Sequence, residues 1–465
     1  MGPSEFTSRI HQVNSNCCLA PAAFRSFPLH SKIMFPKLPL LEKLCAQFSG
    51  GKPLRDVRIL GIQHFLETTG SLIEALIRLG AAPQHIFLAG KNYSSNKDVA
   101  EELKLRGINV IEATGLCGWG KLQGQLESTA AALWKALQES EASGEVIVLD
   151  DGGFTLSADF ARSRRYRMAG VEQTTSGISN LLSAGLPCPV VDVAHSAAKR
   201  VLESPLIEVA VLQRIKSLHG SFLPDLIWGV VGTGNVGTAL FDGLQRAGRR
   251  VLAYDIDWRN SRVADFPFCR DLRELFEECD VVLGCSGQDM LAGQTWWQGI
   301  RGEKTLVSCS SHDVEFRTLL TAWGKTQTEP PADVLGTVVI PTEYGMFTIL
   351  RGGCPVNFDG SRESVPAEDI QLTRALLLIG VLQAREILRA PRPQSRDFLQ
   401  LDTRLQSDVA LDWIHLRAGS KPNVAKLKGI FSDPEQVAAL SRPDGTAFAL
   451  ADRDLKRGST AEPDS

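Results

Sequence analysis

The sequence predicts an α/β protein with two domains, each built around a sheet of largely parallel strands. Two observations carry this prediction. Apolar strand patterns alternate with helical patterns from Val57 onward, and the apolar run Ile227–Val231 enters the glycine motif 232–237. At 465 residues the chain is long enough for two or three domains, and its composition of 43% apolar and 22% charged residues is that of an ordinary globular protein.

The first domain is expected to occupy residues 45–195. Strand patterns lie at 57–62, 85–88, 109–111, 145–149 and 187–193, and helical patterns lie at 72–79, 98–105 and 123–137. A helix containing 196–202 then leads into the nucleotide-binding domain, expected at 196–355 with further strands at 280–284 and 305–309. The alternation predicts a parallel sheet covered by helices.

The glycine motif has the features of a dinucleotide-binding loop. Its first glycine allows a tight turn, its second lets a pyrophosphate approach the backbone, and its third lets the next helix pack on the sheet. The residues of this loop expected to bind the cofactor are Gly232, Gly234, Asn235, Val236 and Gly237.

Asp255 ends the next strand, eighteen residues beyond the last glycine. A carboxylate at this place accepts hydrogen bonds from the adenosine ribose and repels a 2′-phosphate, which favours NAD over NADP. The second domain is therefore predicted to be a Rossmann NAD-binding domain, and the first a parallel-sheet substrate domain. Arg249, Arg250 and Arg259 lie close enough in sequence to weaken the exclusion of NADP.

The ends of the chain are expected to differ from the domains. Residues 1–44 are predicted to be a disordered extension; residues 1–33 are serine-rich and basic, as transit peptides are, but we expect a cytoplasmic protein. Residues 356–390 are expected to return as a long helix that packs on the first domain. Residues 391–465 form a C-terminal region with a disordered tail, and 388–402 have the composition of a linker.

Composition narrows the class of partner. A net charge of −3 gives no electrostatic reason to expect nucleic acid or an anionic membrane, and no apolar run approaches the ~18 residues of a membrane span. The ten cysteines are scattered without the spacing of a zinc site or a disulfide framework. We therefore expect a small-molecule substrate, no metal, and possible assembly into a homo-oligomer.

Polar residues that directly follow strands are the first candidates for chemistry, because ligands bind beyond the carboxyl ends of parallel strands. His64 and Asp151 meet this criterion and could transfer protons at a leaving group; the alternatives are a surface histidine and a capping aspartate. Lys199 and Glu203 are spaced i,i+4 on one helix face. They could act on a substrate hydroxyl, or form a surface ion pair that contributes only ~0.3–0.5 kcal/mol.

Two further clusters are candidates. Thr174, Thr175 and Ser176 precede Gly177 and offer hydroxyls to a phosphate or carboxamide, although they could equally cap a helix. His312 follows the strand at 305–309 and could flank a nicotinamide, although a lone loop histidine is more often structural.

Taken in order, these residues resemble the S-adenosyl-L-homocysteine hydrolase family, from about residue 52 to 384. The segments that carry the resemblance are Lys52-Pro-Leu, Arg58-Ile with His64, Leu149–Gly153, Glu172–Gly177, Gly232–Gly237, Asp255–Asp257 with Asn260, His312–Glu315, and Val356-Asn357. The resemblance implies a permanently bound NAD that oxidises a substrate 3′-hydroxyl before elimination at the 5′ position, addition of water and reduction of the ketone.

The resemblance also implies roles for individual residues. Lys199 would activate the 3′-hydroxyl, His64 with Asp151 would act near the 5′ position, and His312 would lie close to the nicotinamide. The residues that would contact NAD are Thr174, Thr175, Asp255, Asn260 and Asn357.

This chain departs from the family at the substrate. Gln173 stands where the family has an acid for the ribose diol, Glu203 replaces an aspartate, and Ser204 replaces an asparagine. Leu66 and Thr68 stand where the family holds adenine, and only a gap would bring Glu67 there. A histidine that closes the family's site and its C-terminal arm have no counterpart here.

Three functions are therefore open. The first is a hydrolase or lyase of this family that acts on S-adenosyl-L-homocysteine or a related thioether nucleoside. The second is a non-catalytic NAD- or nucleoside-binding regulatory protein, and the third is a plain NAD-dependent dehydrogenase.

Overall fold

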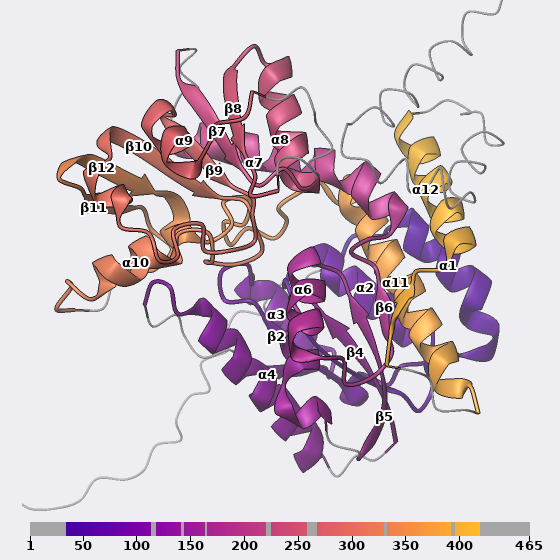
Figure 1. Cartoon of the computed structure of the whole chain (residues 1–465). Helices are drawn as coiled ribbons and strands as arrows, with labels where there is room; N and C mark the ends of the chain where they lie inside the picture. Colours follow the sequence, from indigo (N-terminus) through magenta and orange to yellow (C-terminus); the bar gives the residue numbers. More distant parts are fainter. Residues whose placement is uncertain are drawn as a thin grey trace, which may run out of the picture. The chain divides into compact units, whose positions relative to one another are not determined.

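Within the described part of the chain, seven strands form one parallel sheet. This computed structural model describes residues 34–112, 118–140, 144–162, 165–219, 225–257, 267–329, 333–391 and 396–418 (Figure 1). The strand order is β13-β6-β5-β4-β1-β2-β3. The strands are β1 (Arg58–Gln63), β2 (Ile86–Gly90), β3 (Asn109–Ile111), β4 (Gly144–Asp150), β5 (Tyr166–Glu172), β6 (Val190–Asp192) and β13 (Phe398–Gln400).

The register of this sheet aligns four polar residues at its carboxyl edge. Gln63 of β1 pairs with Gly90 of β2, and Asp150 of β4 pairs with Glu172 of β5 along the full length of both strands. The residues that follow these pairs are His64, Lys91, Asp151 and Gln173. Because parallel strands end at one edge, residues far apart along the chain come together here.

Helices cover the first sheet. They are α1 (Pro39–Phe48), α2 (Glu67–Arg78), α3 (Lys97–Leu105), α4 (Leu122–Glu139), α5 (Phe154–Ser157) and α6 (Thr175–Ala184), with short 3₁₀ turns η1 (Ser49–Gly51), η2 (Pro83–His85) and η3 (Asp159–Arg162). Trp134 of α4 is fully buried, and its indole N–H donates to the Thr155 carbonyl at 2.9 Å. The aromatic side chain thus fixes α4 against α5.

Helix α1 corrects the expected N-terminal extension. The sequence predicts disorder for residues 34–44, but Pro39 begins a helix that buries Leu40, Leu41 and Leu44. Each buried leucine contributes roughly 1.5–3 kcal/mol, which offsets part of the entropic cost of ordering this helix. Residues 1–33 lie outside the described residues.

The second sheet is mixed. Its order is β11-β12-β10-β9-β7-β8, and only β11 and β12 pair antiparallel. The strands are β7 (Ile227–Val231), β8 (Arg250–Tyr254), β9 (Val281–Gly284), β10 (Arg301–Ser308), β11 (Val338–Pro341) and β12 (Tyr344–Ile349). Its helices are α8 (Asn235–Arg246), α9 (Leu272–Glu278) and α10 (Arg317–Gly324), with the 3₁₀ turns η5 (Trp296–Gly299) and η6 (Leu350–Gly353). This confirms the predicted α/β class.

A helical segment connects the two sheets. It begins with the π-helical turn η4 (Lys199–Glu203) and continues as α7 (Ser204–His219), which packs against α8. π-Helical turns inside helices are frequent at functional sites.

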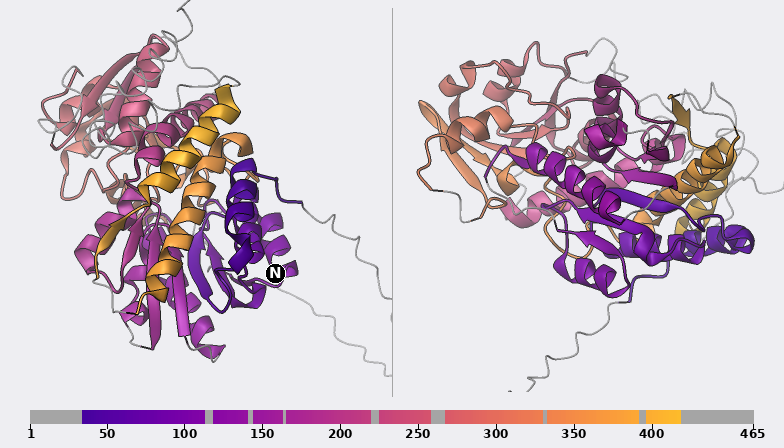
Figure 2. Two further views of the ribbon diagram at one scale, coloured as in Figure 1. Left: turned by 90° about the vertical axis from the view of Figure 1, so that its right-hand side faces the viewer. Right: turned by 90° about the horizontal axis from the view of Figure 1, so that it is seen from below.

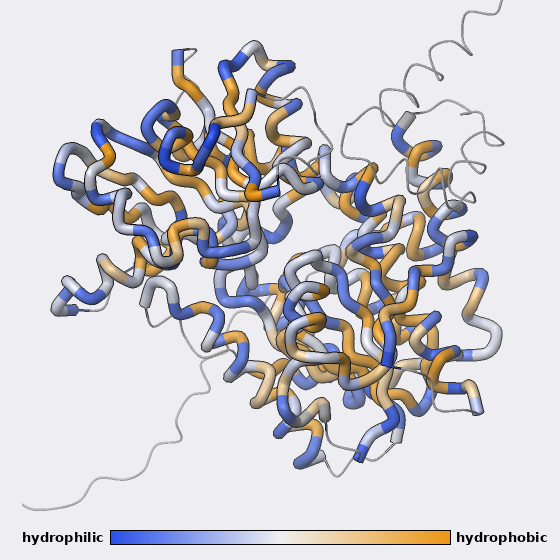
Figure 3. Tube along the Cα trace, viewed as in Figure 1, coloured by the Kyte–Doolittle hydropathy of each residue, from blue (hydrophilic) through white to orange (hydrophobic). Residues whose placement is uncertain are grey.

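The long helix α11 (Ala367–Arg389) returns to the first sheet, as expected, and packs on β5 and α2. A Cβ on Gly380 would lie 2.8 Å from Val171 Cγ1, so a glycine is required for this close approach. In Figure 3, hydrophobic residues run along the strands and along this helix. Buried on nearly its whole circumference, α11 is a core element of the first domain.

Two strands of the first sheet lie outside the sequence prediction. The buried strand β5 is not among the predicted strands, and β13 falls in the segment expected to be a linker. Phe398 of β13 pairs with Val190 of β6, and α12 (Thr403–Ala418) then packs beside α11 (Figures 1 and 2). Part of the C-terminal region thus completes the first domain.

In the part of the chain that the structure describes, no helix is both long and apolar enough to span a bilayer.

Candidate functional site

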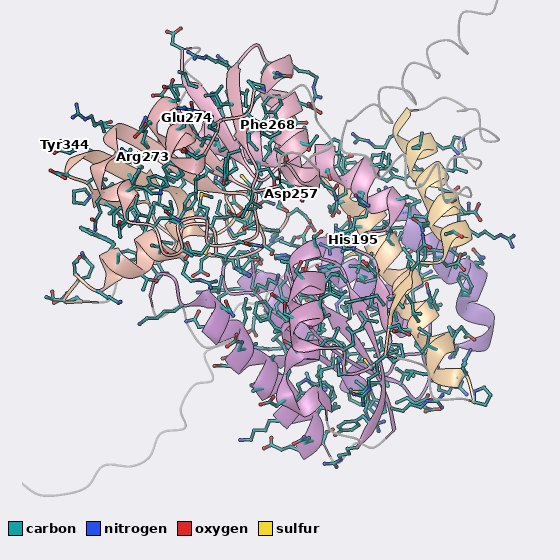
Figure 4. The ribbon with its side chains drawn as sticks, viewed as in Figure 1. His195, Asp257, Phe268, Arg273, Glu274 and Tyr344 are labelled. Atoms are coloured by element: carbon teal, nitrogen blue, oxygen red, sulfur yellow. The ribbon has the colours of Figure 1, made fainter. Side chains whose placement is uncertain are left out.

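A cavity of about 1400 Å³ is lined by residues from the carboxyl ends of strands in both sheets. From the first sheet come His64, Asp151, Gln173 and Thr174, and from the second come Gly232 and Asp255. His195 and Asp257, labelled in Figure 4, line it from the segments after β6 and β8. Both sheets thus bring polar residues to the edge at which parallel strands bind ligands.

The glycine loop between β7 and α8 is built for close approach of a ligand. Gly232 has a φ of +89°, and a Cβ on Gly237 would lie 1.9 Å from the Gly232 carbonyl oxygen. A Cβ on Gly234 would meet nothing within 4 Å, so this residue leaves open space at the start of α8. Asn235 and Val236, the first residues of α8, also line the cavity. The helix N-terminus therefore presents free N–H groups to an anion.

Asp255 is oriented by the same loop. Its Oδ2 accepts hydrogen bonds from the backbone N–H and the hydroxyl of Thr233, at 2.6 and 2.9 Å, and its Oδ1 accepts one from the Asp257 N–H at 3.0 Å. A carboxylate oxygen can accept more than one hydrogen bond, so the group can still accept from a ribose diol. The loop and Asp255 fit a nicotinamide dinucleotide.

Arg249 and Arg250 lie away from Asp255 in the structure. Arg249 precedes β8 and Arg250 begins it, so both lie at the opposite end of this strand from Asp255. Arg259 and the predicted cofactor contact Asn260 lie outside the described residues. Neither Arg249 nor Arg250 thus lies beside Asp255, and the preference for NAD over NADP stays a prediction.

The remaining predicted cofactor residues line the same cavity. Thr174 caps α6 by accepting from the Gly177 N–H at 3.0 Å, and Thr175 and Ser176 follow it. The Ser176 hydroxyl lies 2.6 Å from that of Ser311, which follows β10. Asn357 is 8% exposed and lines the cavity from the segment before α11. These hydroxyl and amide groups suit the polar parts of a dinucleotide.

Replacing Gly234 or Gly237 by alanine is expected to have different effects, the first on NAD binding and the second on stability. We expect Gly234→Ala to leave the unfolding midpoint of the free protein unchanged but to weaken NAD binding, because its Cβ would occupy only ligand space. Gly237→Ala should cost about 1–3 kcal/mol of stability, because its Cβ would overlap a backbone carbonyl. Thermal unfolding with and without NAD measures both effects.

Gly124→Ala is the matched control for these two variants, because Gly124 lies within α4 and its Cβ would meet nothing within 4 Å. It should stabilise the protein by about 0.5–1 kcal/mol and leave NAD binding alone. Unchanged NAD binding in Gly234→Ala would contradict the position assigned to the pyrophosphate.

His64 and Asp151 are in contact and form the centre of a buried polar cluster. His64 Nε2 lies 3.2 Å from Asp151 Oδ2, and Nδ1 lies 2.5 Å from the Ser94 hydroxyl. An ionised carboxylate can only accept, so the Nε2 carries the proton and the Nδ1 accepts from Ser94. The imidazole ring stacks on Phe358, with ring centroids 4.2 Å apart.

Lys91 completes this cluster. It is 0% exposed and forms an ion pair with Asp151, which is 1% exposed. Burial alone would raise the pKa of Asp151, but the neighbouring Lys91 and His64 outweigh it and hold that pKa below its ordinary value. Burial lowers the pKa of His64, partly opposed by Asp151, so the imidazole is neutral at pH 7. The cluster therefore combines an ionised acid with a neutral base.

Gln173 is also hydrogen-bonded to the Asp151 carboxylate. Its amide nitrogen donates to Asp151, while its amide oxygen is buried and has no described hydrogen-bond partner. Because Gln173 lines the cavity, that oxygen is available to accept from a ligand hydroxyl. The substrate-binding role predicted for Gln173 fits this placement.

Glu172, at the end of β5, supports the loops that carry this cluster. Its carboxylate accepts from the Gly153 N–H at 2.8 Å and from the Thr174 N–H and hydroxyl, each at 2.7 Å. Burial and the nearby Asp150 and Asp151 raise the pKa of Glu172. This carboxyl group holds the loop after β4 and the start of α6 in one arrangement.

Lys199 and Glu203 form the ion pair that their spacing predicts, on the wall of the cavity. Their side chains are only 16% and 12% exposed, and Glu203 Oε1 also accepts from the Thr373 hydroxyl at 2.8 Å. A surface ion pair would lie free in water, whereas this one is held by α11. The alternative of an ordinary surface pair is therefore not supported.

His312 lies at the cavity wall and is 6% exposed. Burial, with Lys91 and Arg317 nearby, lowers its pKa to about 3. It makes an edge-on contact with Phe154, at a centroid distance of 6.0 Å. A neutral imidazole that touches the cavity is consistent with the predicted place beside a cofactor ring.

The His312 pKa predicts a pH dependence of stability. The unfolded chain binds this proton near pH 6.5 and the folded protein only near pH 3, so stability is lost as the pH falls between these values. The slope contributed by one such group is about 1.4 kcal/mol per pH unit. We expect His312→Gln to lose less stability than the parent between pH 7 and 5 in urea unfolding. Equal losses in the two proteins would contradict the buried neutral imidazole.

Glu67 and Thr68, predicted to bind substrate, do not line the cavity; Leu66 does. Glu67 pairs with Arg362 at 3.3 Å, and Thr68 is fully buried between two other side chains. These are Glu363, to which Thr68 donates, and Arg374, from which it accepts.

Lys91, which pairs with Asp151, and Arg374, which lines the cavity, were not predicted from the sequence. Lys91 directly follows β2, so the rule applied to His64 could have identified it. Arg374 lies on α11, within a helix whose neighbours are apolar, and no local pattern brings it to the cavity. Among the described residues, no group of three or more histidine, cysteine or acidic residues could hold a metal ion.

Comparison with known proteins adds little about chemistry. No family model matches the chain. Uncharacterized proteins from Mycobacterium tuberculosis strains CDC 1551 and H37Rv are each 28% identical to it over 384 residues, 81% of this chain and 73% of theirs.

Solved structures with some likeness include three proteins. The TT0316 protein of Thermus thermophilus is 15% identical, with 66% of this chain and 99% of that chain covered and a TM-score of 0.33. The dipicolinate synthase A chain of Bacillus subtilis is 10% identical (72% and 94% covered, TM-score 0.32). A 2-hydroxyacid dehydrogenase of Ketogulonicigenium vulgare Y25 is 12% identical (64% and 95% covered, TM-score 0.33). Scores this low carry no argument about function, which rests on the residues of the cavity.

Proposed function

We propose that the protein binds NAD and oxidises a secondary hydroxyl of a nucleoside- or sugar-like thioether, as the first step of the oxidation, elimination and addition cycle of the adenosylhomocysteine hydrolase family. One observation carries this proposal: a single cavity contains the glycine loop with Asp255, the Lys199–Glu203 pair, and the His64–Asp151 pair. A plain dehydrogenase needs only the first two.

The glycine loop, Asp255, Thr174, Thr175 and Asn357 would hold the dinucleotide, which supplies a hydride acceptor when bound. The chain's own contribution to oxidation is at the hydroxyl. Lys199 is held by Glu203, and its Nζ would act on the hydroxyl proton. Gln173, with its unpaired amide oxygen, would orient a neighbouring hydroxyl.

The His64 cluster would move a proton in the elimination. A carbonyl acidifies the adjacent C–H. The neutral imidazole can take that proton at Nδ1 once the Ser94 hydroxyl, which donates to this nitrogen here, is displaced. The imidazolium so formed is stabilised by the Asp151 carboxylate, 3.2 Å from Nε2, and can then protonate the departing sulfur. Lys91 is a positioning residue here, because it is fully buried and touches Asp151 rather than the cavity.

The absorbance of NAD-loaded protein at 340 nm tests the proposal. S-adenosylhomocysteine, adenosine and other nucleosides would be added in turn. A transient signal that decays while substrate is consumed supports the cycle, and a signal with a nucleoside other than the adenosyl compounds would mark a changed specificity. Silence with every compound would favour the non-catalytic NAD-binding function, and lasting NADH in proportion to product would identify a plain dehydrogenase.

A further inference from the structure

Arg374 is a buried cation on the cavity wall. It lies on α11, is 4% exposed, and follows Thr373, which hydrogen-bonds Glu203 of the Lys199 pair. Arginine is rarely this buried unless its charge is paired, because removing the ion from water is costly.

The protein itself satisfies only part of this guanidinium. Arg374 Nε donates to the Thr68 hydroxyl at 3.1 Å, and no described carboxylate forms an ion pair with it. Thr68 is held in turn by Glu363, which accepts from the Thr68 backbone N–H and hydroxyl. The terminal NH₂ groups therefore have no hydrogen-bond partner among the described residues, and Arg374 lines the cavity.

The acids nearest to Arg374 are already occupied. Glu203 accepts from Lys199 and Thr373, and Asp151 accepts from Lys91 and Gln173. Glu363 accepts from the backbone N–H and the hydroxyl of Thr68, and although burial raises its pKa to about 6, it is mostly ionised at pH 7. Arg374 thus remains as a cation without a partner of its own among the described residues.

We propose that Arg374 binds a carboxylate of the substrate, so that the cavity takes an acidic nucleoside- or sugar-like thioether rather than a neutral adenine nucleoside. The planar fork matches a carboxylate in two parallel hydrogen bonds. A monoanion is favoured over a dianionic phosphate, because Glu203 and Glu363 lie within electrostatic range of Arg374. The inference deepens the proposed function and rests on it for the identity of the cavity as the substrate site.

The surrounding residues agree with this substrate class. The two positions at which the resembling family holds adenine are Leu66 and Thr68 here, and Thr68 is turned to Arg374 instead of the cavity. The carboxylate end of the ligand would lie at Arg374. Its hydroxyl would lie near Lys199, which is linked to the same turn of α11 through Glu203 and Thr373.

Ligand binding to the NAD-loaded full chain tests this assignment without turnover. The unfolding midpoint would be measured at constant ionic strength with acetate against chloride, with orotidine against uridine, which lacks the base carboxylate, and with adenosine 5′-monophosphate against adenosine. We expect the carboxylates to raise the midpoint more than their neutral or chloride counterparts. Arg374→Met should weaken binding of the best acid roughly 10- to 100-fold.

Two further variants make the result decisive. Arg374→Lys keeps the charge without the fork and should retain only part of the response, while Arg389→Met, on an exposed position of the same helix, should retain all of it. Equal responses of Arg374→Met and the parent, or no Arg374-dependent response to any carboxylate, would overturn the assignment. A response confined to the phosphate would overturn it also. The 340 nm signal is independent of this binding test, so the proposed oxidation and the carboxylate assignment can fail separately.

Discussion

Lys199→Ala is expected to lower turnover roughly 10²- to 10⁴-fold while the protein still binds NAD. Lys199 lies on the cavity wall with Glu203 as its partner, whereas the predicted dinucleotide contacts belong to the glycine loop and Asp255. Removing the ammonium group therefore removes the group that acts on the substrate hydroxyl and leaves the cofactor site intact. The measurements are the NAD content of the purified variant and its single-turnover rate at 340 nm.

Lys216→Ala is the control for this variant, because Lys216 is an exposed lysine on α7, the helix that continues from the Lys199 turn. It should turn over at the parental rate. Parental turnover by Lys199→Ala would remove the assigned role, and loss of NAD from this variant would show that Lys199 acts on the cofactor instead.

Lys91→Met should destabilise the protein by about 3–5 kcal/mol, because it leaves the Asp151 carboxylate buried without its cation. Lys91 also lowers the pKa of His64, so its removal should raise that pKa. Urea unfolding measures the first effect, and the pH dependence of turnover measures the second.

The double variant Lys91→Met with Asp151→Asn separates charge from packing. Since it removes both charges, it should recover most of the lost stability but not the activity. Lys104→Met, which breaks two ion pairs on the surface of α3, is the control and should cost less than about 1 kcal/mol. If Lys91→Met cost as little stability as Lys104→Met, the buried Asp151 carboxylate would not depend on the Lys91 cation.

Features formed by residues that lie close together in the sequence were predictable. The loop from Gly232 to Gly237 with Asp255 lies within one strand-helix-strand unit, and the spacing of Lys199 and Glu203 places them on one helix face. His64 and Asp151 were predicted because the residue after a parallel strand lies at the carboxyl edge of the sheet, where ligands bind.

Features made by tertiary contact were not predictable in this way. Arg374 lines the cavity because α11 returns to the first sheet. Strand β13 forms by pairing with β6, and Phe398 lies opposite Val190, more than 200 residues earlier in the chain. Glu67 was predicted to bind substrate, but it forms an ion pair with Arg362 and does not line the cavity. Pairings over such distances depend on the fold as a whole, which no local pattern contains.

The most direct test of the account is a multiple-turnover assay without added NAD. Protein purified with its cofactor would be mixed with a many-fold excess of the compound that gives the strongest 340 nm signal, and substrate, product, NAD and NADH would be quantified. The account predicts that substrate is consumed well beyond one equivalent of protein while total NADH stays low, because each oxidation is reversed before product leaves. Consumption that stops at one equivalent, with stoichiometric NADH, would contradict it.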